Sequence, residues 1–159
     1  MNAFKDSAGH EWQVTITVAT VKRVRDLVGV DLLEAAGGEL LRTLALDPVV
    51  LVDVLYAVCK PQADAACIEP EAFGSGMAGD VIDDATVAFL AELVDFFPKS
   101  RRQMLRAVIA KFDEAMEAAY AAAQERIDSP EMKALIDAET KKIGEVPGSS
   151  STNLPESSE

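Results

Sequence analysis

The sequence predicts a mostly α-helical protein in which an N-terminal β-hairpin packs on a helical bundle, followed by a long C-terminal helix and a disordered tail. Near the N-terminus, polar and apolar residues alternate as they do in a half-buried strand. Later segments repeat apolar residues at helical spacing and carry helix-start signals. We therefore expect a globular domain of hairpin, helices and long helix over residues 1–127, a C-terminal helix over 128–143 and a disordered acidic tail over 144–159, which is polar and rich in serine.

Residues 3–17 are typical of a β-hairpin. In the segment EWQVTIT, Trp12, Val14 and Ile16 face one way and the polar residues face the other. The turn-forming segment DSAGH precedes it, and AFK is the expected partner strand. Because a lone two-stranded hairpin is marginal in water, the face that carries Trp12 should cover the helices.

Short helices should follow the hairpin. Thr17 is the expected N-cap of a helix that ends at about Val28, before Gly29. Its predicted apolar stripe consists of Val21, Val24, Leu27 and Val28. A Gly37-Gly38 pair then interrupts an apolar segment, which predicts two short helical pieces.

The most apolar segment should form the helix at the centre of the core. Asp47-Pro48 is a strong start signal, with an acidic N-cap and proline at the first helical position. The sequence VVLVDVLYAVC, which includes Leu55, is apolar nearly all round, as in a helix that is buried on most sides. We expect this helix to end at KPQADAAC, and Glu69-Pro70 to open a short helix that carries Phe73.

Two further helices are predicted before the long one ends. Asp80 or Asp83 should cap a helix that runs to Phe97. Ser100 and Gln103 fit a capping box for the next helix. That helix should run to about residue 127 on the stripe Leu105, Val108, Ile109, Phe112, Met116, Tyr120 and Ala123.

The last predicted helix starts at Ser129-Pro130, with proline at its first position. Its apolar residues are Met132, Leu135, Ile136 and Ile143.

Composition narrows the classes of function. The net charge is −12, which disfavours binding to nucleic acid or to an anionic membrane surface. We expect a cytoplasmic protein, because the N-terminus has no signal-peptide pattern and the two cysteines cannot build a disulfide framework. We also expect no cofactor, because the glycine-rich segment GSGMAGD lacks the spacing, the preceding strand and the lysine of a phosphate-binding loop. His10 lies in a turn without a cysteine or a paired acid at metal-ligand spacing, so the sequence gives no candidate catalytic or metal-binding residue.

A basic cluster interrupts the acidic sequence. No lysine or arginine lies between Lys60 and Lys99, and then Lys99, Arg101, Arg102, Arg106 and Lys111 follow in close succession. In one interpretation Phe96 and Phe97 are core residues, and the cations form a solvated face that the chain's own acids neutralise. In the other, Phe97, Lys99, Arg101, Arg102 and Arg106 form a partner-binding surface, because cations in a first helical turn oppose the helix dipole. Acidic residues of the interval 61–98 on a second copy would then be a matching partner.

The chain resembles the tail assembly chaperones of tailed phages and prophages. The likeness covers residues 4 to about 110 and depends on EWQVTIT, VKRVRDLVGVDLL, DPVVLVDVLYAVCKPQA, Phe73 and AELVDFFP. It implies a small, acidic, non-catalytic protein of the host bacterial cytoplasm that is not part of the mature virion. Its expected partners are the tape-measure protein, which it would keep soluble during tail-tube assembly, tail-tube subunits and further copies of itself.

Other functions remain open from the residues alone. One alternative is a small acidic protein-interaction or regulatory module of the cytosol. A DNA-associated regulator is another, because Lys22, Arg23 and Arg25 lie on one side of a short predicted helix, although the net charge opposes it. The third is an enzyme whose site is assembled from scattered residues.

Overall fold

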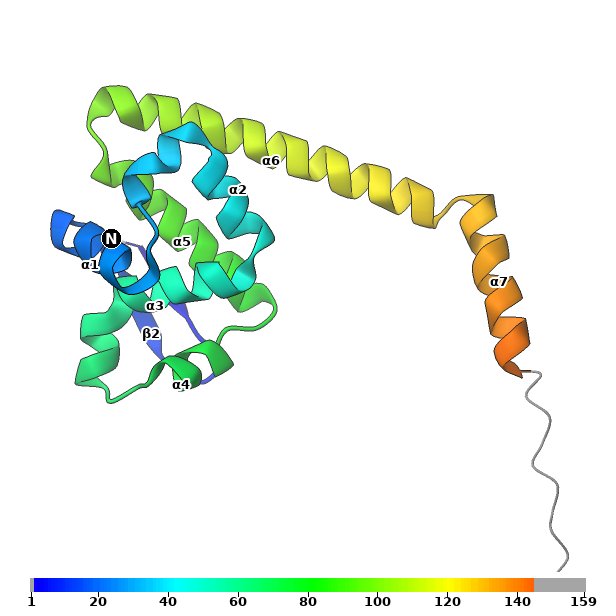
Figure 1. Cartoon of the computed structure of the whole chain (residues 1–159), viewed down its shortest axis with the longest axis horizontal. Coiled ribbons are helices and arrows are strands. Elements are labelled where there is room, and N and C mark those ends of the chain that lie inside the picture. Colours follow the sequence, from blue (N-terminus) through cyan, green and yellow to red (C-terminus); the bar gives the residue numbers. More distant parts are fainter. Residues whose placement is uncertain (1, 145–159) are drawn as a thin grey trace, which may run out of the picture. The chain divides into compact units, whose positions relative to one another are not determined.

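The computed structural model describes residues 2–144 and confirms the predicted fold class: a two-stranded hairpin and a series of helices (Figure 1). The predicted tail over 144–159 lies, apart from residue 144, outside the described residues. The chain forms two compact units that divide between Glu114 and Ala115. The first contains all elements up to the early part of the long helix, and each unit is described below by itself.

The hairpin consists of β1 (Asn2–Lys5) and β2 (Glu11–Val14), which pair antiparallel with Phe4 opposite Trp12. The strand is shorter than the predicted one because β2 ends at Val14, but the predicted inward face is confirmed. Its buried side chains are Phe4, Trp12 and Val14, with Ile16 just beyond the strand. They cover α3 (Pro48–Ala65) and α5 (Asp80–Phe96), as the hairpin's contacts with these helices show.

A buried carboxylate holds the hairpin turn together. Asp6 is 7% exposed and accepts hydrogen bonds from the Trp12 ring N–H at 2.9 Å and the His10 backbone N–H at 2.8 Å. The His10 Nδ1 atom lies 3.1 Å from the same carboxylate. The turn thus brings the His10 ring beside the Asp6 carboxylate.

The turn is also joined to the segment before α5. The Ser7 N–H donates to the Gly76 carbonyl oxygen at 3.1 Å. A Cβ atom at Gly76 would lie 3.2 Å from the Asp6 side chain, closer than nine in ten real Cβ contacts, so glycine permits this approach.

Three short helices follow the hairpin: α1 (Val18–Val28), the 3-10 helix η1 (Leu32–Gly37) and α2 (Glu39–Leu46). The predicted caps of α1 are confirmed, since the Thr17 hydroxyl accepts from the Thr20 N–H and Gly29 ends the helix with φ 76°. The stripe prediction was wrong for Leu27, which is 56% exposed. The stripe residues Val21 and Val24 are buried as predicted, and α1 packs on α3.

Helix α3 is the centre of the core, as predicted. It contacts α1, α2, α5, β2 and α4 (Pro70–Ser75), and Leu55 is fully buried. The Asp47 carboxylate caps it by accepting from the N–H groups of Val49 and Val50. Phe73 of α4 closes one side of this core, with its ring centroid 4.8 Å from that of Trp12.

The end of α3 falls within the predicted segment KPQADAAC, and the helix continues through Pro61 to Ala65 before it ends. Proline has no N–H to donate to the carbonyl four residues earlier, which here belongs to Ala57. The Arg23 guanidinium of α1 donates to that carbonyl through Nε and to the Val58 carbonyl at 3.0 Å. The helix therefore tolerates Pro61 because a side chain from another helix replaces the missing donor.

Both predicted caps around α5 and α6 (Lys99–Ile127) were wrong. Gly79 is the N-cap of α5, and Asp80 and Asp83 lie in its first turn, where acids interact favourably with the helix dipole. Helix α6 begins at Lys99, so Ser100 is already helical. The Arg102 N–H donates to the Pro98 carbonyl oxygen at 2.9 Å, which makes Pro98 the residue that precedes the helix.

The second unit contains the later part of α6 and α7 (Pro130–Gly144). The predicted end of α6 at residue 127 and the predicted start of α7 are confirmed, and the Ser129 hydroxyl accepts from the Met132 N–H at 3.3 Å. Side chains from 117 to 128 and from 130 to 141 are exposed. The large apolar ones among them are Tyr120, Ile127, Met132, Leu135 and Ile136.

Candidate partner-binding sites

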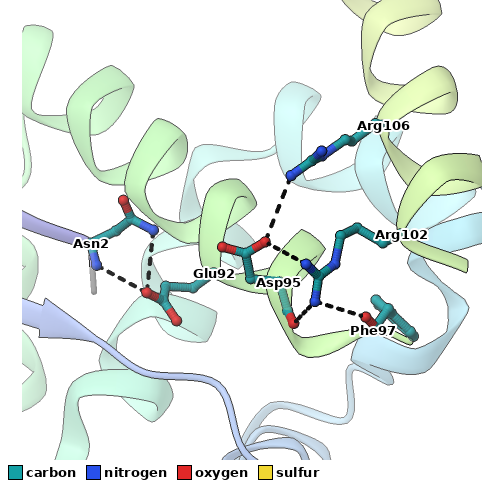
Figure 2. A network of polar contacts seen from close by, with 6 residues as sticks. All are labelled: Asn2, Glu92, Asp95, Phe97, Arg102 and Arg106. Carbon is teal, nitrogen blue, oxygen red and sulfur yellow. Dashed lines mark hydrogen bonds and ion pairs between the residues drawn. The ribbon is translucent and has the colours of Figure 1, made fainter. Parts of the chain in front are cut away.

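The basic cluster lies at the corner between α5 and α6. The Arg102 guanidinium turns back over the end of α5 and donates to the carbonyl oxygens of Asp95 at 2.9 Å and Phe97 at 3.4 Å (Figure 2). Its other terminal nitrogen lies 3.6 Å from the Asp95 carboxylate. Because the last carbonyls of a helix have no donor within that helix, Arg102 acts as a C-terminal cap of α5.

Arg106 shares the same acid. One of its terminal nitrogens lies 3.7 Å from the Asp95 carboxylate oxygen that Arg102 also approaches (Figure 2). The side chain is 64% exposed, so this ion pair is a weak one in water. Arg102 and Arg106 thus follow the first interpretation of the cluster, in which the chain's own acids neutralise it.

Lys99 and Arg101 differ from these two arginines. Both are exposed in the first turn of α6, and neither forms an ion pair with any residue that the structure describes. The helix dipole disfavours cations at this position. These two residues are therefore the part of the predicted surface that remains available to a partner.

Phe97 does not belong to the surface. It is 2% exposed and packs edge-on against Phe96, with the ring centroids 5.4 Å apart. The sequence led us to expect an exposed aromatic edge there, but the chain turns at Pro98 and directs the Phe97 ring into the core. The sequence alone does not show whether a single aromatic residue is buried, and the burial of Phe97 excludes it from the partner-binding surface.

The same helix end is connected to the hairpin. The Glu92 carboxylate of α5 accepts from the Asn2 backbone N–H at 3.0 Å and from its side-chain amide at 3.2 Å (Figure 2). These bonds fix the first strand against α5, one turn before the residue that Arg102 caps. Hydrogen bonds thus hold β1, α5 and α6 together at the corner where Lys99 and Arg101 are exposed.

A cleft between α1 and α3 is a second candidate site, which sequence reasoning missed. It has a volume of about 530 Å³ and is lined by Leu27, Val28, Asp53, Tyr56, Ala57, Lys60, Glu69 and Pro70. Leu27 is 56% exposed beside it. Asp53 and Glu69 add acidic groups and Lys60 a basic one to an apolar wall, and the Lys60 ammonium is already paired with Asp64 at 2.7 Å. The cleft therefore suits an apolar side chain with a basic neighbour.

A third hollow runs between α5 and the early part of α6, within the first unit. Its two adjoining parts have volumes of about 350 Å³ and 410 Å³ and share Leu90, Ile109 and Asp113. The spacing of the lining residues on α5 places them on one face: Asp83, Thr86, Val87, Leu90, Ala91, Val94 and Asp95. We call this hollow the α5–α6 groove.

Three further observations concern metal binding, membrane spanning and cysteine reactivity. Among residues 2–144, no three His, Cys, Asp or Glu side chains are grouped as a metal ion would require. Within the same part of the chain, no helix is long and apolar enough to cross a membrane. Cys59 is buried and Cys67 exposed, and both are free thiols. Burial raises the pKa of the Cys59 thiol to about 12, so it stays protonated.

Comparison with family models, with curated proteins and with solved structures gave no match to this chain. The function is therefore argued from the surface features above and from the sequence resemblance.

Proposed function

We propose that the protein is a non-catalytic tail assembly chaperone that binds the tape-measure protein and keeps it soluble while the tail tube assembles. It would act in the host bacterial cytoplasm, contact tail-tube subunits and other copies of itself, and leave before the virion is complete. The client in this proposal is a long chain of helices whose apolar seams are exposed until the tube encloses them. Such a client needs a soluble partner that offers apolar surface.

The observation that carries the proposal is the α1–α3 cleft with its exposed leucine. Leu27 lies at a helical position where the sequence pattern predicts burial, yet it is 56% exposed. An apolar side chain from a client helix can enter the cleft and cover Leu27, in the manner of helix-in-groove recognition. Asp53 and Glu69 at its edge favour a helix that carries lysine or arginine beside its apolar seam.

The net charge of −12 supports the same role. Like charges keep complexes of this protein apart, so that a bound apolar client stays dispersed. Lys99 and Arg101 would provide a second contact, to acidic residues of the client or to the interval 61–98 of a neighbouring copy. Exposed cations of this kind steer association and fix register more than they add affinity.

The alternative is a small acidic interaction or regulatory module with a different basic partner, which the net charge also favours. Such a module would use the same α1–α3 cleft but would bind a protein other than the tape-measure protein. A DNA-associated regulator has less support, because Arg23 is committed to carbonyls of α3. An enzyme is a further alternative, for which the polar side chains that line the cleft, Asp53, Tyr56, Lys60 and Glu69, would be the candidate groups.

Co-purification tests the proposal. A tagged chain is co-expressed with a tape-measure protein and recovered from the soluble fraction at several salt concentrations. Recovery of the client with the wild-type chain, reduced by Arg101→Gln mainly at low salt, is the expected result. A chain that recovers no client, or that instead retains DNA at low salt, would overturn the proposal.

A further inference from the structure

We propose that the α1–α3 cleft selects a helix in which an apolar residue has a basic residue about one turn away on each side, and that Asp53 and Glu69 set this preference. The preference deepens the proposed function, on which it rests, because it names the class of client segment that the cleft accepts. The order of charged and apolar groups along the cleft carries it.

Helix α3 supplies one wall of the cleft through a single stripe of side chains. Asp53, Tyr56, Ala57 and Lys60 line the cleft, and their positions i, i+3, i+4 and i+7 share one face of a helix. Asp53 and Lys60 are therefore separated by about 10 Å along α3, at 1.5 Å per residue. Tyr56 and Ala57 lie between them, about one turn from each. The stripe thus begins at an acid, continues over an apolar middle and ends at Lys60.

The charge of Lys60 is already balanced. Its ammonium group lies 2.7 Å from Oδ1 of Asp64 and 5.7 Å from the centre of the Tyr56 ring. The hydrogen bond to Asp64 raises the pKa of Lys60, and the charge of Glu69 contributes a smaller part of this rise. Glu69 therefore lies near Lys60 and places a second carboxylate at this end of the cleft.

Asp53 and Glu69 carry the unbalanced charge of the cleft. Neither carboxylate forms a hydrogen bond or an ion pair with another residue of the described range 2–144. Three carboxylates, counting that of Asp64, lie in or beside the cleft against the one ammonium group of Lys60. Each end of the cleft can therefore accept a cation from a partner.

The middle of the cleft is apolar and held open. Leu27 and Val28, in the last turn of α1, line it opposite α3, and Leu27 is 56% exposed. The Arg23 guanidinium, one turn before Leu27, donates to the carbonyl oxygens of Ala57 and Val58 and so fixes α1 against α3. The apolar walls are therefore in place before a client binds, which lowers the cost of binding.

A helix that lies along the α3 stripe meets these groups in order. Its apolar residue enters the middle and covers Leu27, and the basic residues on either side reach Asp53 and Glu69. In the client sequence, this pattern is a basic residue at i, an apolar residue at i+4 and a basic residue at i+7, which share one helix face. The charge pairs fix the register, and the apolar contact supplies affinity. A helix with acids at the flanking positions meets like charges and is rejected.

Peptide binding to the purified full chain tests this preference. The probe is a fluorescein-labelled, alanine-rich helical peptide of about 18 residues, with leucine at i+4 and arginine at i and i+7. A second peptide has glutamate in place of both arginines, and a third keeps the arginines but has glutamine in place of leucine. In fluorescence anisotropy, the wild-type chain should bind the first peptide at least tenfold more tightly than either of the others.

Charge reversal at the two ends of the cleft should reverse the preference. The double variant with Asp53→Lys and Glu69→Lys should bind the glutamate peptide more tightly than the arginine peptide. The matched control combines Glu34→Lys and Asp84→Lys, at exposed acids that line neither the cleft nor the α5–α6 groove. It has the same net charge as the cleft variant and should keep the wild-type order, which separates local pairing from attraction by the whole chain.

Circular dichroism shows whether each variant folds. Where the cleft variant does not fold, Asp53→Asn combined with Glu69→Gln takes its place and should lose most of the preference. A wild-type chain that binds none of the peptides, or a folded cleft variant that keeps the wild-type order, would overturn the proposal. Equal changes in the cleft variant and the control, or tight binding of the glutamine peptide, would do so as well.

The solubility of a co-expressed tape-measure protein separates this result from the proposed function. If the tape-measure protein stays soluble but the peptide preference is absent, the proposed function stands and Asp53 and Glu69 do not select the client. If the preference is present but the tape-measure protein is insoluble, the cleft selects a basic helix of another protein and the proposed function fails.

Discussion

Arg102 closes the C-terminal end of α5 by donating a 2.9 Å hydrogen bond to the backbone carbonyl oxygen of Asp95. The residue belongs to α6, so the bond holds the two helices in place at the corner between them. Its neighbour Arg101 is exposed and forms no ion pair with the residues that the structure describes. Two adjacent arginines thus have different tasks, although the sequence presents them as one cluster.

Arg102→Met should lower the free energy of unfolding by about 1 kcal/mol. The change removes the side-chain donor to the carbonyl oxygens of Asp95 and Phe97, and methionine cannot replace it. Arg101→Met should change it by less than about 0.5 kcal/mol, as is usual for an exposed residue. Urea denaturation of both variants measures the difference. Equal effects would show that Arg102 is not a cap.

The pair formed by Arg23 and Pro61 gives a second prediction. Arg23→Met leaves the Ala57 carbonyl without a donor and should cost about 1–3 kcal/mol of stability. In a Pro61→Ala background the helix regains its own N–H at residue 61, so the same change should cost less. A double-mutant cycle measures this coupling, which should be at least about 0.5 kcal/mol. Additive effects would mean that Arg23 stabilises the fold in another way.

Asp6 should make stability depend on pH in the acid range. Burial raises its pKa, but hydrogen bonds from Trp12 and His10 lower it by more, so the pKa of Asp6 lies below its ordinary value. A group with a lowered folded pKa stabilises the fold fully above its unfolded pKa of about 3.9, and this contribution is lost as the pH falls through the folded pKa.

Urea denaturation at several values between about pH 7 and pH 2 tests this linkage. Asp6→Asn should be less stable than the wild type at neutral pH, and its stability should fall less steeply below about pH 4. Asp26→Asn, at an exposed residue of α1, is the control and should follow the wild-type curve. Parallel curves for the wild type and Asp6→Asn would contradict the assignment.

The two cysteines should react very differently. The buried Cys59 thiol has a pKa raised to about 12, chiefly by burial, whereas Cys67 is exposed. Because the thiolate is the reactive form, iodoacetamide should modify Cys67 in the native protein and both cysteines in urea. Mass spectrometry of peptides reads out each site. Rapid native modification of Cys59 would show that the α3 core opens readily.

Local signals predicted most of the helix ends. Thr17, Gly29 and Asp47 cap helices through bonds to residues one turn away, so adjacent residues in the sequence were enough to predict these caps. The continuation of α3 through Pro61 could not be predicted, because the donor that compensates for this proline is Arg23, 38 positions earlier in the chain. Sequence patterns report propensity, and tertiary contacts override it at such positions.

The candidate sites show the same division. The sequence located the basic cluster, but only the turn at Pro98 decides that Phe97 is buried and that Arg102 faces Asp95. The α1–α3 cleft was missed because Leu27 falls on the apolar stripe of its helix, where a pattern cannot distinguish a core residue from an exposed one. An exposed leucine on such a stripe is visible only once the helices are placed.

The most direct test of the proposed function is the fraction of tape-measure protein that stays in the supernatant when it is co-expressed with this chain. The wild-type chain should raise that fraction severalfold, Leu27→Gln should remove at least half of the gain, and Leu46→Gln should retain it, because Leu46 is equally exposed but lies outside the cleft. A tape-measure protein that is equally insoluble with and without the wild-type chain would contradict the central claim.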